Sequence, residues 1–134
     1  MSVHKNDFPA VQPELDRLIE TRKIPNALLF TGHHGSGRNR AALWFARAVN
    51  CTADHGWPCN QCRSCRKITA DQHPDMILLS PAEPQKPITI SQIRQITALT
   101  GVRPHEADYR MVLITDAGQM NIQAQNALLK ELEE

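Results

Sequence analysis

A glycine-rich loop between an apolar run and an amphipathic stretch is the feature that most constrains the fold of this chain. Gly32, Gly35 and Gly37 match the glycine frame of a phosphate-binding loop, G-x-x-x-x-G-K-[ST]. Residues 27–31 are almost wholly apolar, as in a strand buried on both faces, and residues 40–50 have a wide apolar helical face. The order of strand, loop and helix is the context that such a loop requires, although a plain glycine turn before a helix is the alternative interpretation.

The side chains that would act on a phosphate are replaced in this loop. Arg38 stands where the motif has lysine, and Asn39 stands where it has serine or threonine. A guanidinium is a planar fork, bulkier than the ammonium that reaches the β- and γ-phosphates, and an amide oxygen is a less well placed magnesium ligand than a hydroxyl. We therefore expect the degenerate site to disfavour ATP, while an anion or an unhydrolysed nucleotide in the loop stays an open alternative.

The second half of a nucleotide site is also incomplete. Residues 112–115 form an apolar strand pattern that ends at Asp116, and the next residue is Ala117, where a hydrolysing ATPase of this type has a glutamate. Alanine cannot orient or polarise an attacking water. The replacements at Arg38, Asn39 and Ala117 together argue against hydrolysis, so we expect no catalytic residue. Asp116 is either the remnant of a metal-linked site or a structural acid at the end of a strand.

Length and charge limit the possible functions of the chain. The 134 residues suit one domain, 1–134, and the formal net charge of +1 gives no field that would indicate binding to nucleic acid or to a membrane. No apolar run reaches the roughly 18 residues of a membrane span, and the N-terminus lacks the layout of a secretory signal. We therefore expect a cytoplasmic protein with no membrane partner.

Strand and helix patterns alternate along the chain, which predicts an α/β fold with a parallel sheet and right-handed crossovers. The predicted strands are 27–31, 75–79 and 109–115, and the predicted helices are 13–22, 40–50, a helix with Ser91 as N-cap that ends near Gly101, and 121–134. Residues 80–87 contain three prolines and are expected to form a loop. Because three strands are few for such a sheet, we expect an N-terminal piece of a longer protein.

Four cysteines, Cys51, Cys59, Cys62 and Cys65, lie within fifteen residues. Two overlapping C-x-x-C units have the spacing of a zinc knuckle, in which a short turn directs neighbouring thiolates at one ion. Four thiolates complete a tetrahedral site and leave no position for water, so the sequence predicts a structural zinc ion.

Other residues near the cysteines have secondary roles in this prediction. Trp57 is expected to cover the site, and His55 and His73 are alternative ligands that a full cysteine set makes unnecessary. Disulfides and a catalytic thiol pair are the competing interpretations. Disulfides suit a cytoplasmic chain with clustered C-x-x-C units less well, and a catalytic pair would leave two cysteines unexplained. The cations expected to offset the charge of the thiolates are Arg63, Arg66 and Lys67.

Several of these motifs together resemble a known family. The motifs are residues 28–32 before the loop, the cysteine spacing, His73-Pro74-Asp75 before a strand, Thr115-Asp116-Ala117, and residues 126–134 (NALLKELEE). In this order, over nearly the whole chain, they resemble the clamp-loader subunits of bacterial DNA polymerase III, which are AAA+ proteins. The resemblance implies a three-layer P-loop NTPase-like parallel sheet flanked by helices, with a zinc module inserted at about residues 51–66.

The resemblance also implies a role within a DNA-directed nucleotidyltransferase assembly. Its ATPase subunits carry an intact lysine and threonine in the loop and an Asp-Glu pair after the strand, and Arg38, Asn39 and Ala117 depart from that pattern. The departures resemble the subunit that binds no ATP and presents an arginine to a neighbouring nucleotide site. The implied partners are the delta and gamma/tau subunits and, through the complex, the sliding clamp and primer–template DNA. The arginine, the lid domain and the C-terminal oligomerisation domain are expected beyond Glu134.

Two other functions compete with that of a non-hydrolysing clamp-loader subunit. An active ATPase of the gamma/tau kind, with a variant loop, would bind nucleotide and turn it over with Mg²⁺. A zinc-dependent nucleic-acid-binding module would bind DNA in a salt-sensitive manner, although the near-neutral charge weighs against it.

Overall fold

The computed structural model describes residues 10–33 and 35–133 and divides the chain into two compact units. The first unit comprises Met1–His73 and Ala107–Tyr109, and the second comprises Pro74–Glu106 and Arg110–Glu134. The described residues form five α-helices and two β-strands, which confirms the α/β class. Glu134, the predicted end of the last helix, lies outside the described residues.

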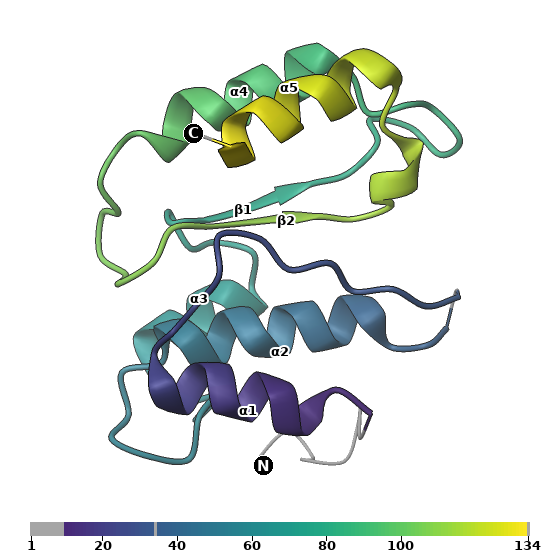
Figure 1. The fold of residues 1–134 in the computed structure, drawn as a ribbon. Coiled ribbons are helices and arrows are strands. Elements are labelled where there is room, and N and C mark those ends of the chain that lie inside the picture. The colour runs from purple at the N-terminus through teal and green to yellow at the C-terminus, as the bar shows by residue number, and fades with distance from the viewer. Residues whose placement is uncertain (1–9, 34, 134) are drawn as a thin grey trace. The chain divides into compact units, whose positions relative to one another are not determined.

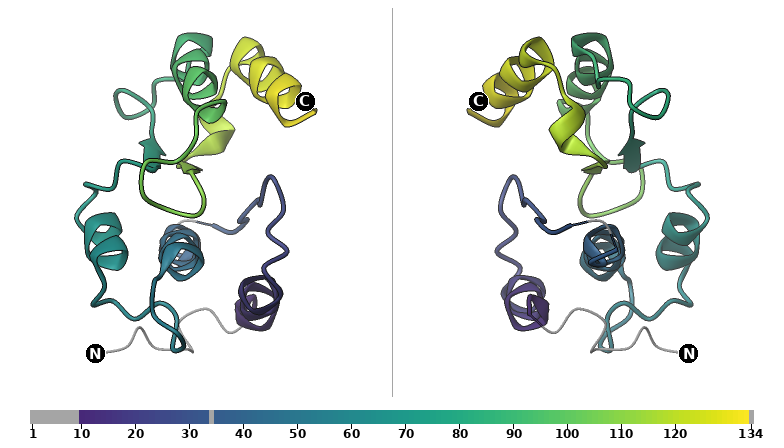
Figure 2. Two further views of the ribbon diagram at one scale, coloured as in Figure 1. Left: turned by 90° about the vertical axis from the view of Figure 1, so that its left-hand side faces the viewer. Right: turned by 90° about the vertical axis from the view of Figure 1, so that its right-hand side faces the viewer.

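The first unit is built from three helices, α1 (Gln12–Thr21), α2 (Arg38–Asn50) and α3 (Arg63–Thr69). Figures 1 and 2 show α2 between the other two. One face of α1 contributes Leu15 and Ile19 to the core, and α3 contributes Ile68. Most of α2 is buried, and its buried residues are Ala41, Ala42, Trp44, Phe45, Ala46, Ala48, Val49 and Asn50. The predicted helices 13–22 and 40–50 are therefore confirmed, with α2 beginning two residues earlier than predicted.

Residues 107–109 are attached to this helical unit by polar contacts. The Asn50 side chain donates to the carbonyl of Tyr109 at 3.0 Å and accepts the Tyr109 N–H at 3.1 Å. Arg22, which ends α1, donates to the carbonyl of Val49 at 3.1 Å, pairs with Asp108 at 3.2 Å, and lies 5.7 Å from the centre of the Tyr109 ring. The contacts join a segment distant in sequence to the ends of α1 and α2.

The second unit is a pair of strands covered by two helices. Strands β1 (Met76–Leu79) and β2 (Met111–Ile114) are parallel, with Met76 opposite Met111. Helices α4 (Ile90–Thr100) and α5 (Ile122–Glu133) lie on one face of the strands, and the short 3₁₀ helix η1 (Ala117–Gln119) precedes α5 (Figure 1). The core consists of Ile88, Ile93 and Ala124, with Leu79, Ile114, Met120, Ala127 and Leu128 packed against it. The parallel pairing predicted for these two strands is confirmed.

The start of α4 differs from the prediction. The N-cap is Thr89, not Ser91, and it forms a capping box with Gln92. The Thr89 hydroxyl accepts the Gln92 N–H at 3.3 Å, and the Gln92 amide oxygen accepts the Thr89 N–H at 3.0 Å. A capping box needs a glutamine or glutamate three residues after the cap. Gln92 meets that need for Thr89, whereas Ser91 would have Arg94 there.

The predicted strand at residues 27–31 is wrong in this structure. The segment has no strand assignment, and Leu28 and Leu29 are 41% and 80% exposed. Its apolar side chains suit a buried strand, but a strand also needs a neighbour for its backbone N–H and C=O groups. Among the described residues, β1 and β2 form a ladder only with each other.

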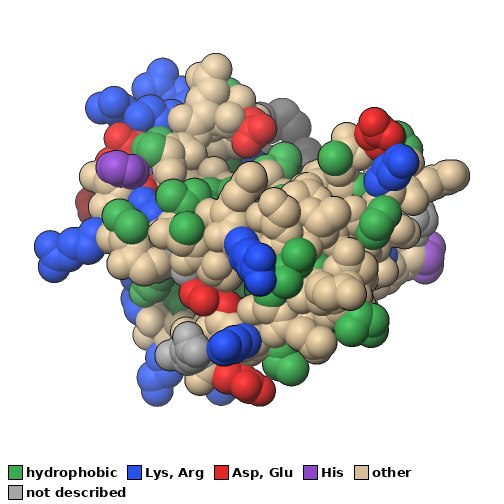
Figure 3. Space-filling model, turned by 90° about the horizontal axis from the view of Figure 1, so that it is seen from above, with side chains coloured by type: hydrophobic (Ala, Val, Ile, Leu, Met, Phe, Trp, Pro, Cys, Tyr) green, Lys and Arg blue, Asp and Glu red, His purple; other side chains and the backbone are tan. Residues whose placement is uncertain are grey.

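The surface over α4 and α5 mixes apolar and charged side chains. Figure 3 shows apolar side chains scattered among backbone and other side chains, with some Lys, Arg, Asp and Glu between them and without one continuous apolar area. Exposed apolar residues on these two helices are Leu99, Ile122, Leu129 and Leu132. No described helix combines the length and the apolar content that crossing a membrane would take.

A buried carboxylate organises the polar interior of the second unit. Asp75, just before β1, is fully buried and accepts the N–H groups of His105 at 2.6 Å and Glu106 at 2.8 Å. It also pairs at 3.3 Å with Arg110, whose side chain is 8% exposed. Arg110 donates in turn to the carbonyls of Leu99 and Arg103. Asp75 therefore links the start of β1, the loop after α4 and the residue before β2.

Replacement of this buried acid is expected to be costly. Asp75→Ala leaves the Arg110 charge buried without its partner and should lower the free energy of unfolding by about 3 kcal/mol or more. Urea denaturation followed by circular dichroism measures the change. The matched control is Asp108→Ala, which removes an ion pair of exposed groups and should cost less than about 1 kcal/mol. Equal losses in the two variants would contradict the importance of Asp75.

Candidate functional sites

The glycine loop leads directly into α2. Gly37 is the N-cap of the helix with φ of 89°, and its carbonyl accepts the Ala41 N–H at 2.9 Å. A side chain at Gly32 would meet the Ser36 hydroxyl oxygen at 2.5 Å from its Cβ. Glycine is favoured at Gly37 because a positive φ strains other residues, whereas a Cβ at Gly32 would require the Ser36 side chain to shift. The backbone therefore explains Gly37 of the motif without any ligand.

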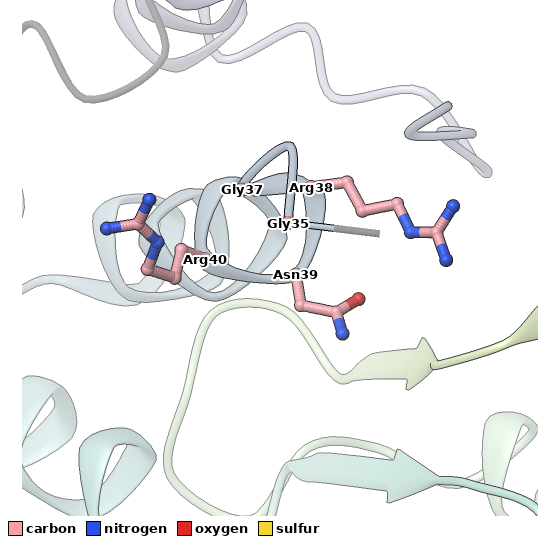
Figure 4. A pocket seen from close by; sticks show the side chains of 5 residues that line it. All are labelled: Gly35, Gly37, Arg38, Asn39 and Arg40. Atoms are coloured by element: carbon pink, nitrogen blue, oxygen red, sulfur yellow. The ribbon is translucent and has the colours of Figure 1, made fainter. Parts of the chain in front are cut away.

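The side chains of the loop do not converge on one point. Figure 4 shows Arg38 and Arg40 pointing in opposite directions from the start of α2, with Asn39 in a third direction. Arg38 donates to the carbonyl of Gly32, so it interacts with the backbone of the loop itself. A cavity of about 320 Å³ is lined by Gly35, Gly37, Arg38, Asn39 and Arg40. These residues offer positive charge, backbone groups and the amide of Asn39, but no carboxylate or hydroxyl.

Asp116 lies in the second unit, whereas the glycine loop lies in the first. It follows β2 after Thr115, is exposed, and has a left-handed backbone with φ of 52°. Ala117 is the first residue of η1 and brings no polar side chain to this position. Asp116 is thus the one acid at the end of β2 among the described residues there.

The four cysteines lie together in the first unit. Cys51 follows the last residue of α2, Cys59 lies in the loop, Cys62 is the N-cap of α3, and Cys65 is on α3 and fully buried. Their sulfur atoms all lie within 4.8 Å of one another, and all four are free thiols. This arrangement could hold a metal ion.

Backbone N–H groups surround the sulfur atoms. Cys59 Sγ accepts the N–H groups of Gln61 at 3.4 Å and Cys62 at 3.1 Å, and Cys62 Sγ accepts that of Cys65 at 3.4 Å. The Cys59 N–H reaches Cys51 Sγ at 3.4 Å. Such donors stabilise negative charge on sulfur, as a thiolate ligand requires.

The thiols differ in their tendency to ionise. Burial raises the pKa of Cys65 and of Cys51. Burial acts in the same direction on Cys62, but hydrogen bonds from the backbone of Thr52 and Cys65 outweigh it and lower the pKa of Cys62 to about 6. At neutral pH the cluster thus combines a ready thiolate with buried thiols that a metal would have to deprotonate.

Arg47 is a neighbour of the cluster that the sequence patterns did not single out. The Cys65 thiol donates to its backbone carbonyl at 3.9 Å. Burial lowers the pKa of the Arg47 guanidinium, and negative charge at Cys65 opposes that shift. The signal in the sequence was weak: Arg47 stands four residues before Cys51, near the end of the helix that leads into the cluster.

The remaining candidates near the cluster have other surroundings. His55 is exposed and His73 is buried, and neither is part of the cluster of candidate metal ligands, which consists of the four cysteines. Trp57 is half-buried within the cysteine loop, where its ring N–H donates to the carbonyl of Ala53 at 2.5 Å. That Trp57 covers a metal stays a prediction.

The fold and these sites define an α/β protein with a glycine loop before a buried helix and a four-cysteine cluster after it. The family described as DNA polymerase III, delta subunit, matches residues 9–134, and the chain belongs to this family. Its sequence is similar to the delta-prime subunit of Bacillus subtilis, with 32% identity over 100% of this chain and 41% of that protein. It is also similar to the delta-prime subunit of Pseudomonas aeruginosa, with 34% identity over 95% of this chain and 39% of that protein.

Similarity extends to another subunit of the same polymerase. The tau subunit of Bacillus subtilis is 36% identical over 90% of this chain and 21% of its own length. The chain thus spans about two fifths of the delta-prime relatives and about one fifth of tau. The identities to the delta-prime and tau subunits are similar, so they do not indicate which kind of subunit this chain resembles more. The side chains of the loop bear on that question.

The positive φ of Gly37 leads to a prediction about stability that does not depend on any ligand. Gly37→Ala places a Cβ at a φ of 89° and should lower the free energy of unfolding by about 1–2 kcal/mol, because a left-handed backbone is strained for alanine. Gly118→Ala is the control, since a Cβ there meets nothing within 4 Å, and its effect should stay within about 0.5 kcal/mol. Chemical denaturation compares the two, and a neutral Gly37→Ala would show that the loop backbone adapts.

Proposed function

We propose that this chain is the AAA+ nucleotide-binding-type region, 1–134, of a delta-prime-like clamp-loader subunit that does not hydrolyse ATP. The observation that carries the proposal is the composition of the loop cavity. Arg38 interacts with the carbonyl of Gly32, and Asn39 supplies no hydroxyl for a magnesium ion. Ala117 after β2 supplies no carboxylate for an attacking water.

The relatives give this proposal its setting. Their names describe delta-prime and tau subunits of DNA polymerase III. The proposed partners are accordingly the delta and gamma/tau subunits, and the proposed role is to help place the sliding clamp on primer–template DNA in the cytoplasm. The similarity to tau keeps an active ATPase as the competing function, and the replaced side chains favour the non-hydrolysing one. In this role the chain acts by contact with its neighbours.

The four cysteines are proposed to hold one structural zinc ion. Tetrahedral ligation with Zn–S distances of about 2.3 Å separates sulfur atoms by about 3.8 Å. The sulfur atoms here lie within 4.8 Å of one another, so a small contraction would complete the site. Zinc would join the end of α2 to α3 and leave no open position for water, so its contribution would be to folding.

Titration with nucleotide tests the proposed loss of ATPase function. Isothermal titration of the chain with ATP and Mg²⁺ should give no saturable heat, and phosphate release should not exceed the uncatalysed rate. The comparison variant combines Arg38→Lys, Asn39→Thr and Ala117→Glu, which restores the three missing groups. Saturable binding with Mg²⁺-dependent turnover in the unaltered chain would overturn the proposal and favour the active ATPase.

Metal analysis tests the zinc site separately. The purified chain should contain about one zinc ion, and Co²⁺ in its place should show the absorption of a tetrahedral thiolate site. Cys59→Ser should weaken metal binding by at least about tenfold, whereas His55→Ala should leave it unchanged because His55 lies outside the cluster. Metal-free protein without reactive thiols would instead favour disulfides.

A further inference from the structure

Arg47 is a partly buried cation on the helix that leads into the cysteine cluster. Its Nε atom is buried and has no hydrogen-bond partner among the described residues. Its backbone carbonyl accepts the Cys65 thiol at 3.9 Å, so Arg47 and the most buried cysteine are neighbours. A buried N–H donor with no partner costs free energy, and such a group calls for an explanation.

Metal binding would create the charge that such a donor can stabilise. Four thiolates around a dication leave two negative charges, and Cys65 is fully buried, so water cannot solvate its share. The sequence directs attention to Arg63, Arg66 and Lys67 as the compensating cations. Arg63 and Arg66 are exposed on α3, where water and salt screen their charges. Arg47 and Lys67 are partly buried, so their charges are screened less, and Arg47 contacts a cysteine of the cluster through its backbone carbonyl.

We propose that Arg47 is the charge-compensating and positioning residue of the cysteine metal centre. Its charge belongs to the residue whose backbone carbonyl contacts the Cys65 thiol, and its buried Nε–H is the donor that would turn toward the thiolate charge once a metal has displaced the thiol protons. The role is one of support, because the four cysteines already complete the set of ligands. This inference rests on the proposed zinc site.

Zinc affinity of matched variants tests the role of Arg47. Competition with a chromophoric chelator should show Arg47→Gln binding zinc about 10–100-fold more weakly than the unaltered chain, as for the loss of other outer contacts of metal ligands. Arg47→Lys, which keeps the charge, should recover part of the loss. Arg66→Gln removes an exposed cation of the same module and should change affinity less than about threefold, because its charge is screened.

A spectroscopic measurement separates this role from simple packing. The thiolate-to-metal charge-transfer band of the Co²⁺ form should shift in Arg47→Gln and move back in Arg47→Lys, while circular dichroism of the two variants stays alike. If Arg47→Gln fails to fold, the zinc affinities of Arg47→Lys and Arg66→Gln are compared instead. The proposal then requires the Arg47→Lys variant to bind zinc more weakly than the Arg66→Gln variant.

The outcomes distinguish the two proposals. An unaltered chain that binds no zinc would reject the metal site and this inference with it. An unaltered chain that binds zinc, with an Arg47→Gln variant of equal affinity and an unshifted band, would reject the role of Arg47 alone and leave the zinc site standing. Equal weakening by Arg47→Gln and Arg66→Gln would also reject it, since general positive charge would then suffice.

Discussion

Burial of α2 is the constraint on which both candidate sites depend. Trp44, Phe45 and Val49 fix this helix between α1 and α3, and almost nothing of these three side chains reaches solvent. The glycine loop ends where α2 begins, and Cys51 follows where it ends. A helix of 13 residues is about 20 Å long, so one packed element holds two sites apart from each other.

In the proposed function both sites hold structure and neither catalyses a reaction. The loop has the glycine frame of a phosphate-binding turn, but Arg38 interacts with Gly32 and the neighbouring side chains point away from one another. The cysteines form a complete set of four ligand atoms with no further position. Each site thus lies at one end of α2, and in the proposed role each would fix the shape of that end for contacts with neighbouring subunits.

Local sequence was sufficient where one element satisfies its own requirements. The spacing of Leu15 and Ile19 identifies α1, and the cysteine spacing identifies a cluster whose turns close through N–H···S bonds only two or three residues long. The N-cap of α4 could also have been predicted locally, because Thr89 followed three residues later by Gln92 is the pattern of a capping box. Ser91 is followed three residues later by Arg94, which does not fit that pattern.

The sequence was therefore sufficient for four of the five described α-helices, the parallel strand pair, the glycine turn and the grouping of four thiols, whereas the short helix α3 was not predicted. Tertiary structure alone decided which groups lose contact with water. It placed Asp75 among the N–H groups of residues about thirty positions away and set the Arg47 carbonyl beside the Cys65 thiol, and residues 27–31 have no strand assignment. Burial and strand pairing depend on segments that are distant along the chain, and no local pattern records which of them will meet.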